Sequence, residues 1–348
     1  MRHPDLRSVR RCAALVLTAT ALLAGCAVQR GEEVPPPPLE PPVAEATWQL
    51  VERDVVLASL AGRSDATAYA RQAITDWIER VRQYAEEDFI PWYTGYWTQE
   101  WLALKVALSG ADDDAAATEE LARHLQAEFA ARVLAPASEQ LDPSGILRQA
   151  TATYLGTLRT AVAQIGRRHR VPERALGAWL DQVSAIAAAD PEAPGASLGE
   201  LVGAGSEQQL QPYSALLEQV DARGVNLEKR LAEGELAPAA SAVAADFVAR
   251  VAARGGAAAA TFMGGPVGAA ISIGLTGWSL AQHEQQRPEQ EVQLRAHLDA
   301  IRARLYRALF DDPDNGVLGA VNHIHAQIVA ALRASPRGKA SQPYQSPW

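Results

Sequence analysis

From about Thr47 onward, apolar residues recur at intervals of three and four, which is the spacing of one face of an α-helix. The clearest example is a stripe of five aliphatic residues: Leu294, Leu298, Ile301, Leu305 and Leu309. Arg295, Arg302 and Arg304 fall off this stripe. The pattern therefore predicts a helix that buries an apolar face and leaves a basic face in solvent.

The whole chain favours helix over strand. Alanine, leucine, glutamate, arginine and glutamine dominate, and no run of alternating apolar and polar residues indicates a strand. We expect an all-α protein, a multi-helix bundle with an Ala/Gly-rich apolar helix or hairpin at its centre. Proline and glycine divide it into about eight to ten helices. The expected breaks lie near Pro91, Gly110, Pro143, Pro172, residues 191–206, Pro238, Pro288 and Pro313.

The expected central element is residues 255–282, GGAAAATFMGGPVGAAISIGLTGWSLAQ, which carry no formal charge. Small residues recur at every fourth position and would let another backbone approach closely: Ala260, Gly264, Gly268, Ser272 and Thr276. A segment that is apolar all round is either a membrane span or a buried core helix. The strip from Gly264 to Thr276 is therefore a candidate for membrane insertion or for tight packing.

Composition decides the order of these alternatives. The segment exceeds the ~20 residues that cross a bilayer, but its many glycines and alanines gain little in hydrocarbon. Gly264-Gly265-Pro266 also permits a turn within it. We expect a buried central helix or hairpin first, a membrane-inserted hairpin or span second, and a partner-binding surface patch third.

The N-terminus indicates export. Arg2, Arg7, Arg10 and Arg11 form a basic head, followed by a short apolar stretch, Ala13–Ala24. This arrangement is typical of a secretory signal peptide, and the stretch is shorter than a membrane-spanning helix.

Leu23-Ala24-Gly25-Cys26 resembles the lipobox of bacterial lipoproteins. The resemblance covers only the first 26 residues. It implies cleavage before Cys26, diacylglycerol on the Cys26 sulfur and acylation of the new amine, for example with palmitate. Several acyl chains give stable membrane anchoring. Because Ala27 rather than aspartate follows the cysteine, the resemblance implies the outer membrane, with the protein facing the periplasm.

The sequence predicts four segments. Residues 1–25 form the signal peptide, and residues 26–46 contain the lipidated cysteine and a proline-rich linker. Six prolines within residues 35–42 favour an extended polyproline spacer. Residues 47–334 form the helical domain, and residues 335–348 form a tail that we expect to be disordered.

Cysteine content and charge limit the function further. The only cysteines are Cys12 and Cys26, so the mature chain would have no disulfide. The formal charge of the full chain is −9. Residues 1–25 carry four arginines and one aspartate, so about −12 remains without them. This balance disfavours binding to nucleic acid.

Aromatic residues cluster within residues 84–101, YAEEDFIPWYTGYWTQEW. Their spacing suggests that Phe89, Tyr93, Tyr96 or Trp97, and Trp101 share one helical face. Three interpretations are open: helix–helix packing, a surface for a partner or membrane interface, and a ligand site in which aromatic rings stack on sugars beside carboxylates. The candidate residues are Trp92, Tyr93, Tyr96, Trp97, Trp101, Glu87 and Asp88.

Three short motifs are better explained by structure than by chemistry. Gly195-Ala196-Ser197-Leu198-Gly199 matches a nucleophile-elbow pattern but follows a loop, so Ser197 is expected to cap a helix containing Glu200. His323 and His325 lie on different sides of a helix, which does not suit a metal pair. Residues 311–316, DDPDNG, are expected to form a turn. No motif for a cofactor or metal ion was found.

These observations predict a lipid-anchored envelope protein with a structural or protein-interaction role and an envelope protein as its partner. One alternative is a cell-wall glycan-binding or glycan-hydrolysing protein that uses residues 84–101. The other is a membrane-inserting helical protein that uses residues 255–282. The lack of a recognisable catalytic arrangement favours the first function over an enzyme.

Overall fold

The computed structural model describes residues 42–109, 114–187, 195–203, 210–227, 230, 236–258 and 268–335. The side chains of residues 104, 107–109 and 253–283 are outside this description. The expected signal peptide, Cys26, most of the linker and the tail from residue 336 therefore lie outside the described residues. Residues Ala44–Trp348 form one compact unit, separate from Met1–Val43.

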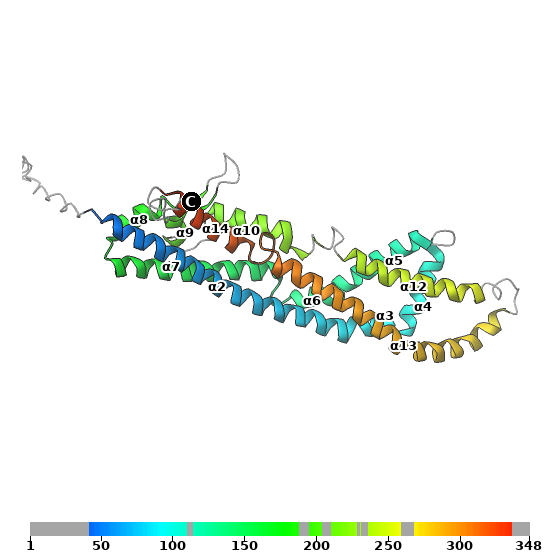
Figure 1. The fold of residues 1–348 in the computed structure, drawn as a ribbon. Coiled ribbons are helices and arrows are strands. Elements are labelled where there is room, and N and C mark those ends of the chain that lie inside the picture. Colours follow the sequence, from blue (N-terminus) through cyan, green and yellow to red (C-terminus); the bar gives the residue numbers. More distant parts are fainter. Residues whose placement is uncertain are drawn as a thin grey trace, which may run out of the picture. The chain divides into compact units, whose positions relative to one another are not determined.

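The all-α expectation is confirmed (Figure 1). The N-terminal half contains α2 (Glu45–Tyr84), η1 (Ala85–Phe89), α3 (Ile90–Thr94), α4 (Tyr96–Ser109), α5 (Asp114–Phe129), η2 (Ala130–Leu134), α6 (Ala135–Ser138), α7 (Pro143–His169) and α8 (Glu173–Leu180). The rest contains β1 (Ser184–Ile186), β2 (Ala196–Ser197), α9 (Leu198–Gly203), α10 (Gln211–Val220), η4 (Asp221–Val225), α12 (Ala237–Ala258), α13 (Gly268–Tyr306), η5 (Arg307–Asp311) and α14 (Gly319–Ala334). The η elements are π-helical turns.

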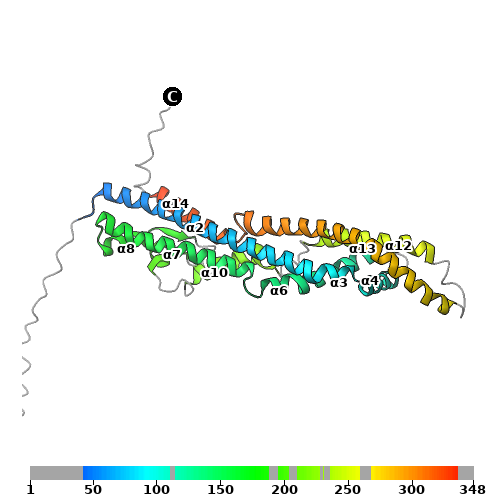
Figure 2. The ribbon, with the colours of Figure 1, turned by 90° about the horizontal axis from the view of Figure 1, so that it is seen from below.

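The longest helix, α2, lies beside α7 in both ribbon views (Figures 1 and 2). Four small residues of α2 are buried at spacings of four: Ala58, Gly62, Ala66 and Ala70. A Cβ atom at Gly62 would lie only 3.0 Å from the Tyr154 backbone oxygen of α7. Small side chains thus allow the two helix backbones to approach closely.

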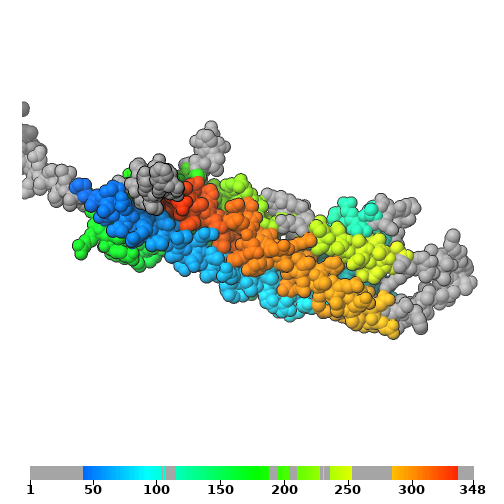
Figure 3. Space-filling model, in the orientation of Figure 1, coloured from blue at the N-terminus to red at the C-terminus, as the bar shows by residue number. Residues whose placement is uncertain are grey.

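Helices α13 and α14 pack against α2, whereas α4, α5 and α12 pack mainly against one another. The described part of α13 lies along α2 in the space-filling view (Figure 3), and α14 contacts α2, α7 and β1. The five residues of the predicted stripe from Leu294 to Leu309 are all buried, whereas Arg295 and Arg302 are half-buried and Arg304 is exposed. The expected buried apolar face is confirmed, whereas the expected solvent-exposed basic face holds only for Arg304.

Most expected breaks coincide with helix boundaries. Pro143 and Pro238 lie in the first positions of α7 and α12, and Pro172 immediately precedes α8, where a missing N–H costs no helical hydrogen bond. The break expected at Pro288 is wrong, because α13 continues through it. Pro288 is exposed, while the following turns bury Gln290 and Leu294, so packing holds the helix across the proline.

The expectation of no strands also needs correction. Strands β1 and β2 pair antiparallel, with Ser184 opposite Ser197 and Ile186 opposite Ala196. Strands of two and three residues are too short to produce a readable alternation of apolar and polar residues.

The apolar segment 255–282 is described only in part. Its backbone forms the end of α12 and the beginning of α13, while residues 259–267 and the side chains of the segment lie outside the description. The interpretation of the strip from Gly264 to Thr276 stays a prediction. Among the described residues, no helix has both the length and the apolar character needed to span a bilayer.

Candidate functional site

The aromatic cluster divides into a buried part and an exposed part. The exposed fractions of Phe89 and Tyr93 are 4% and 2%, whereas those of Trp97 and Trp101 are 80% and 45%. The prediction that they share one helical face is wrong. Gly95 adopts an extended conformation between α3 and α4, and this interruption turns the tryptophans away from the buried face.

The buried part belongs to the core. The Phe89 ring meets the Phe129 ring edge-on at 5.3 Å, and Tyr93 lies 6.5 Å from the Phe247 ring. The Nη2 atom of Arg250 donates to the Tyr93 hydroxyl at 3.3 Å. Burial raises the pKa of Tyr93. Tyr93 therefore joins α3 to α12 and is not available as a surface residue.

The exposed part occupies one face of α4. Trp97, Trp101 and Lys105 recur at every fourth position, and we call these three residues the tryptophan face. The Lys105 Nζ atom lies 4.4 Å from the centre of the Trp101 ring, a cation–π contact. Leu102, by contrast, is fully buried. Helix α4 thus packs one side and presents two indoles to solvent.

His124 of α5 lies behind this face. Its ring is 5.0 Å from the Trp101 ring and 6.3 Å from the Trp92 ring. Its Nε2 atom is buried and has no hydrogen-bond partner within the described part of the chain. Burial and the charge of Lys105 lower the pKa of His124, so the neutral imidazole is favoured between the two indoles.

The two candidate carboxylates are exposed but already engaged. The Nη1 atom of Arg132 donates to Asp88 at 2.9 Å, and the Arg132 guanidinium lies 4.9 Å from the centre of the Trp92 ring. Glu87 accepts from Gln83 at 3.1 Å. Asp88 therefore positions Arg132 against the half-buried Trp92. Trp97 and Trp101 are the exposed aromatic candidates.

The expected cap at Ser197 is confirmed. The Ser197 Oγ atom accepts from the Glu200 backbone N–H at 3.1 Å, and Glu200 accepts from the Ser197 backbone N–H at 2.7 Å. Ser197 does end a two-residue strand, contrary to expectation, but its hydroxyl donates to Glu200 at 3.0 Å and has no hydrogen bond to a histidine in the described structure. This is a capping box, not an activated nucleophile.

The turn expected at residues 311–316 is also present. Asp312 accepts from the backbone N–H groups of Asp314 and Asn315 at 3.0 and 2.9 Å. These bonds close the turn between η5 and α14. In the described residues, no group of three histidine, cysteine, aspartate or glutamate side chains is arranged to hold a metal ion.

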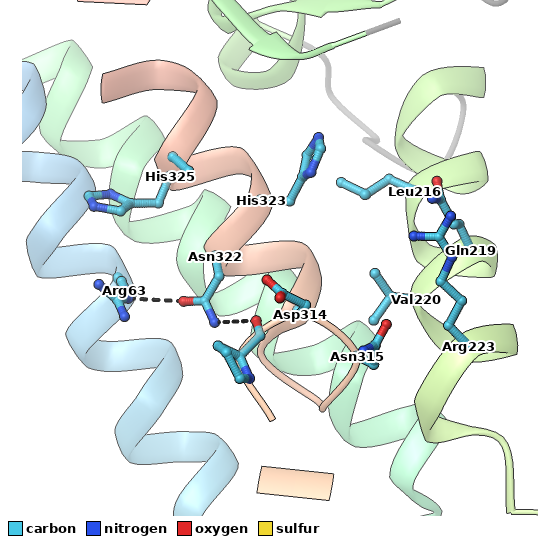
Figure 4. A pocket seen from close by; sticks show the side chains of 13 residues that line it. Arg63, Leu216, Gln219, Val220, Arg223, Asp314, Asn315, Asn322, His323 and His325 are labelled. Atoms are coloured by element: carbon cyan, nitrogen blue, oxygen red, sulfur yellow. Dashed lines mark hydrogen bonds between the residues drawn. The ribbon is translucent and has the colours of Figure 1, made fainter. Parts of the chain in front are cut away.

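A polar pocket of about 680 Å³ lies beside this turn (Figure 4). It is lined by Arg63, Leu216, Gln219, Val220, Arg223, Pro313, Asp314, Asn315, Gly319, Asn322, His323, His325 and Ala326. Sequence reasoning missed this site, because its residues come from α2, α10, η4, α14 and the turn before α14. His323 and His325 form a recognisable pair in the sequence, but their spacing does not indicate that Arg63 and Arg223 line the same pocket.

A buried hydrogen-bond network supports one wall of the pocket. The Ser59 Oγ atom lies 2.7 Å from the Tyr154 hydroxyl and 2.8 Å from the Nδ1 atom of His325. Burial raises the pKa of Tyr154 to about 12, and burial together with the charge of Arg63 lowers that of His325. The hydrogen bond from this network holds the His325 ring in position. Because Ser59 is fully buried, a substrate in the pocket could not reach its hydroxyl.

Comparison with known proteins identifies no relative. No protein-family model matches the chain, and no curated protein or solved structure is significantly similar to it. Its function must therefore be inferred from the geometry of its own residues.

Proposed function

We propose that this protein is a lipid-anchored envelope protein that binds a protein partner through the tryptophan face. The observation that carries the proposal is the exposure of Trp97 and Trp101 on one side of α4. Exposed indoles offer a large apolar area at little conformational cost, and tryptophan is enriched among residues that dominate binding energy at interfaces.

The neighbours of the indoles suggest the chemistry of the partner. Lys105 lies over Trp101, and the His124 ring packs 5.0 Å from the Trp101 ring and 6.3 Å from the Trp92 ring. A rigid base keeps the entropic cost of binding low. An apolar pocket that accepts the indoles, with a carboxylate at its rim for Lys105, would complement this face.

Photo-crosslinking in intact cells tests the binding surface. A benzophenone amino acid replaces the exposed Glu100, which lies between the two tryptophans, in the full-length chain. We expect a discrete protein adduct that is lost when W97A and W101A are added. The same label at the exposed Arg174 of α8 is the control and should not give this adduct. An adduct that persists in the double variant would contradict the proposal.

A sedimentation assay separates a protein partner from a glycan. Purified peptidoglycan is mixed with the detergent-solubilised full-length protein and with the W97A/W101A variant. We expect neither to sediment with the glycan. Tryptophan-dependent sedimentation would replace the proposed partner by the cell wall.

The anchor is tested at Cys26, on which the localisation depends. Labelling with radioactive palmitate should mark the full-length chain, and C26S should remove the label. A label that persists in C26S would contradict the proposed anchor.

A further inference from the structure

The first half of α2 carries a stripe of exposed leucines. Leu50, Leu57 and Leu60 are all exposed, and we call them the leucine stripe; the exposed fraction of Leu57 is 56%. Arg53 lies on the same side of the helix, three residues after Leu50 and four before Leu57. Val51, in the same turns, is fully buried. The leucine stripe is therefore an apolar face in solvent, separate from the face that α2 turns toward the core.

The C-terminal end of α7 places a second arginine beside Arg53. The Nη1 atom of Arg168 donates to one oxygen of Asp54 at 3.0 Å, and the Nη2 atom of Arg53 donates to the other at 3.4 Å. Hydrogen bonds from His169 and Arg168 lower the pKa of Asp54. Asp54 is buried, but the side chains of Arg53 and Arg168 are 65% and 62% exposed. One buried carboxylate thus holds two exposed guanidinium groups close together.

Two more arginines surround this pair in the sequence. Arg167 and Arg170 are exposed, and neither forms an ion pair within the described part of the chain. Residues 143–172 contain five arginines and no aspartate or glutamate, although the full chain has a formal charge of −9. The exposed carboxylates nearest to these arginines in sequence are Glu45 and Glu173. The exposed charges in this area are therefore mostly positive.

Helix stabilisation accounts for only part of this arrangement. Arginines in the last turn of a helix interact favourably with its dipole, which explains Arg167 and Arg168. It does not explain Arg53, which lies in the third turn of α2, or the leucine stripe beside it. Exposed leucines next to arginines are typical of a helix surface that lies in the interface of an anionic bilayer.

We propose that the leucine stripe and the arginines around Asp54 lie on a bilayer surface that contains anionic phospholipid. The leucines enter the interfacial layer, and the guanidinium groups bind lipid phosphates. Charge complementarity favours this occupant over a second copy of the chain, because a symmetric contact would bring like charges together. The acidic remainder of the protein has little influence, since salt screens charges beyond about 10 Å at 0.1 M.

The position of α2 in the chain is consistent with this contact, which rests on the proposed anchor at Cys26. Ala44, the residue before α2, follows Cys26 by 18 positions. A chain of this length spans at most roughly 65 Å. The anchor therefore keeps the first turns of α2 near the bilayer, where a weak surface contact is favoured by a high effective concentration.

Fluorescence quenching tests the contact on the lipidated full-length protein in vesicles. The exposed Ala61 of α2 follows the leucine stripe directly, and A61C carries an environment-sensitive fluorophore. Because the other two cysteines are Cys12 in the expected signal peptide and the acylated Cys26, the label has a unique target. The matched control is A300C, an exposed alanine of α13. Nitroxide-labelled phospholipid is the quencher, in vesicles of phosphatidylcholine with or without phosphatidylglycerol.

We expect quenching at position 61 to be severalfold stronger than at position 300, and only when phosphatidylglycerol is present. R167Q/R170Q should strongly reduce it, because each arginine near an anionic surface contributes about a fivefold factor to binding. R167K/R170K should retain most of it, since a bilayer requires charge rather than a fixed geometry. Circular dichroism checks that both variants keep the helical fold.

Equal quenching at positions 61 and 300 would overturn the proposal, as would quenching that persists in R167Q/R170Q or in pure phosphatidylcholine. A fluorescence change at position 61 that depends on protein concentration without lipid would assign the face to a second copy. The palmitate label on Cys26 tests the anchor separately. A palmitate-labelled protein without quenching at position 61 refutes only this contact, and an unlabelled protein with arginine-dependent quenching refutes only the anchor.

Discussion

The α2–α7 pair and the tryptophan face use large and small side chains in opposite ways. On α2, alanines and Gly62 bring the backbone of α7 close, and Trp77 is completely buried. On α4, Trp97 is 80% exposed. Residue type alone therefore does not decide burial in this protein. The helical face on which a residue lies decides it, and a single break such as Gly95 changes that face.

The largest difference in stability between the α2 core and the tryptophan face is expected when Trp77 and Trp97 are each replaced by alanine. Trp77 donates its indole N–H to Ser138 at 3.2 Å. W77A removes this bond and leaves a large cavity, so we expect it to lower the free energy of unfolding by about 3–5 kcal/mol. Urea denaturation followed by circular dichroism measures this value. A loss below about 1 kcal/mol would mean that the α2 core relaxes easily.

The second-largest effect is expected from alkaline pH, which should lower the free energy of unfolding through Tyr154 of α7. Burial favours the neutral Tyr154 phenol, whose pKa rises from 10.0 to about 12 in the folded state. The unfolded tyrosine therefore ionises first, and stability falls between about pH 10 and 12 by roughly 2–3 kcal/mol. Urea denaturation at several pH values tests this loss. Y154F should have a shallower pH dependence, with a remainder from Tyr69 and Tyr93, whose pKa values burial also raises.

Enlarging a small residue of α2 should have an intermediate effect. Ala66 is fully buried, so A66L must displace its neighbours and should cost about 1–3 kcal/mol. S64L adds a leucine on an exposed position of the same helix and should change stability by less than about 0.5 kcal/mol. Thermal melts of the two variants give the comparison. Equal melting temperatures would show that the face does not require small residues.

The smallest effect on stability is expected at the tryptophan face. W97A should change the free energy of unfolding by less than about 0.5 kcal/mol, because the ring is mostly in solvent. W101A should cost somewhat more, since its ring packs on His124. Urea denaturation measures both values. A W97A loss as large as that of W77A would assign Trp97 a structural role and weaken the proposed binding surface.

Local periodicity predicted the helices well. The stripe from Leu294 to Leu309 is buried along its whole length, because a helix that packs against a core needs apolar residues every three or four positions. The buried alanines and Gly62 of α2 are not apparent as a group in the sequence, because charged residues such as Arg63 and Asp65 lie between them. Residues 255–282 stand out instead because they carry no formal charge.

The candidate sites were less predictable. The sequence identified the aromatic cluster but not the effect of Gly95, because one extended residue between two helices leaves the local composition unchanged. The polar pocket depends on tertiary structure. Arg63, Arg223 and His323 are far apart in the chain and line one pocket only because α2, η4 and α14 come together in the fold.

The position of α2 in the chain has a mechanical consequence. If the protein is held at Cys26 and bound at Trp97, the covalent chain between these two points contains the whole of α2, from Glu45 to Tyr84. A load applied between them would therefore test how firmly α2 is held by α7, whose backbone lies close to it at Gly62.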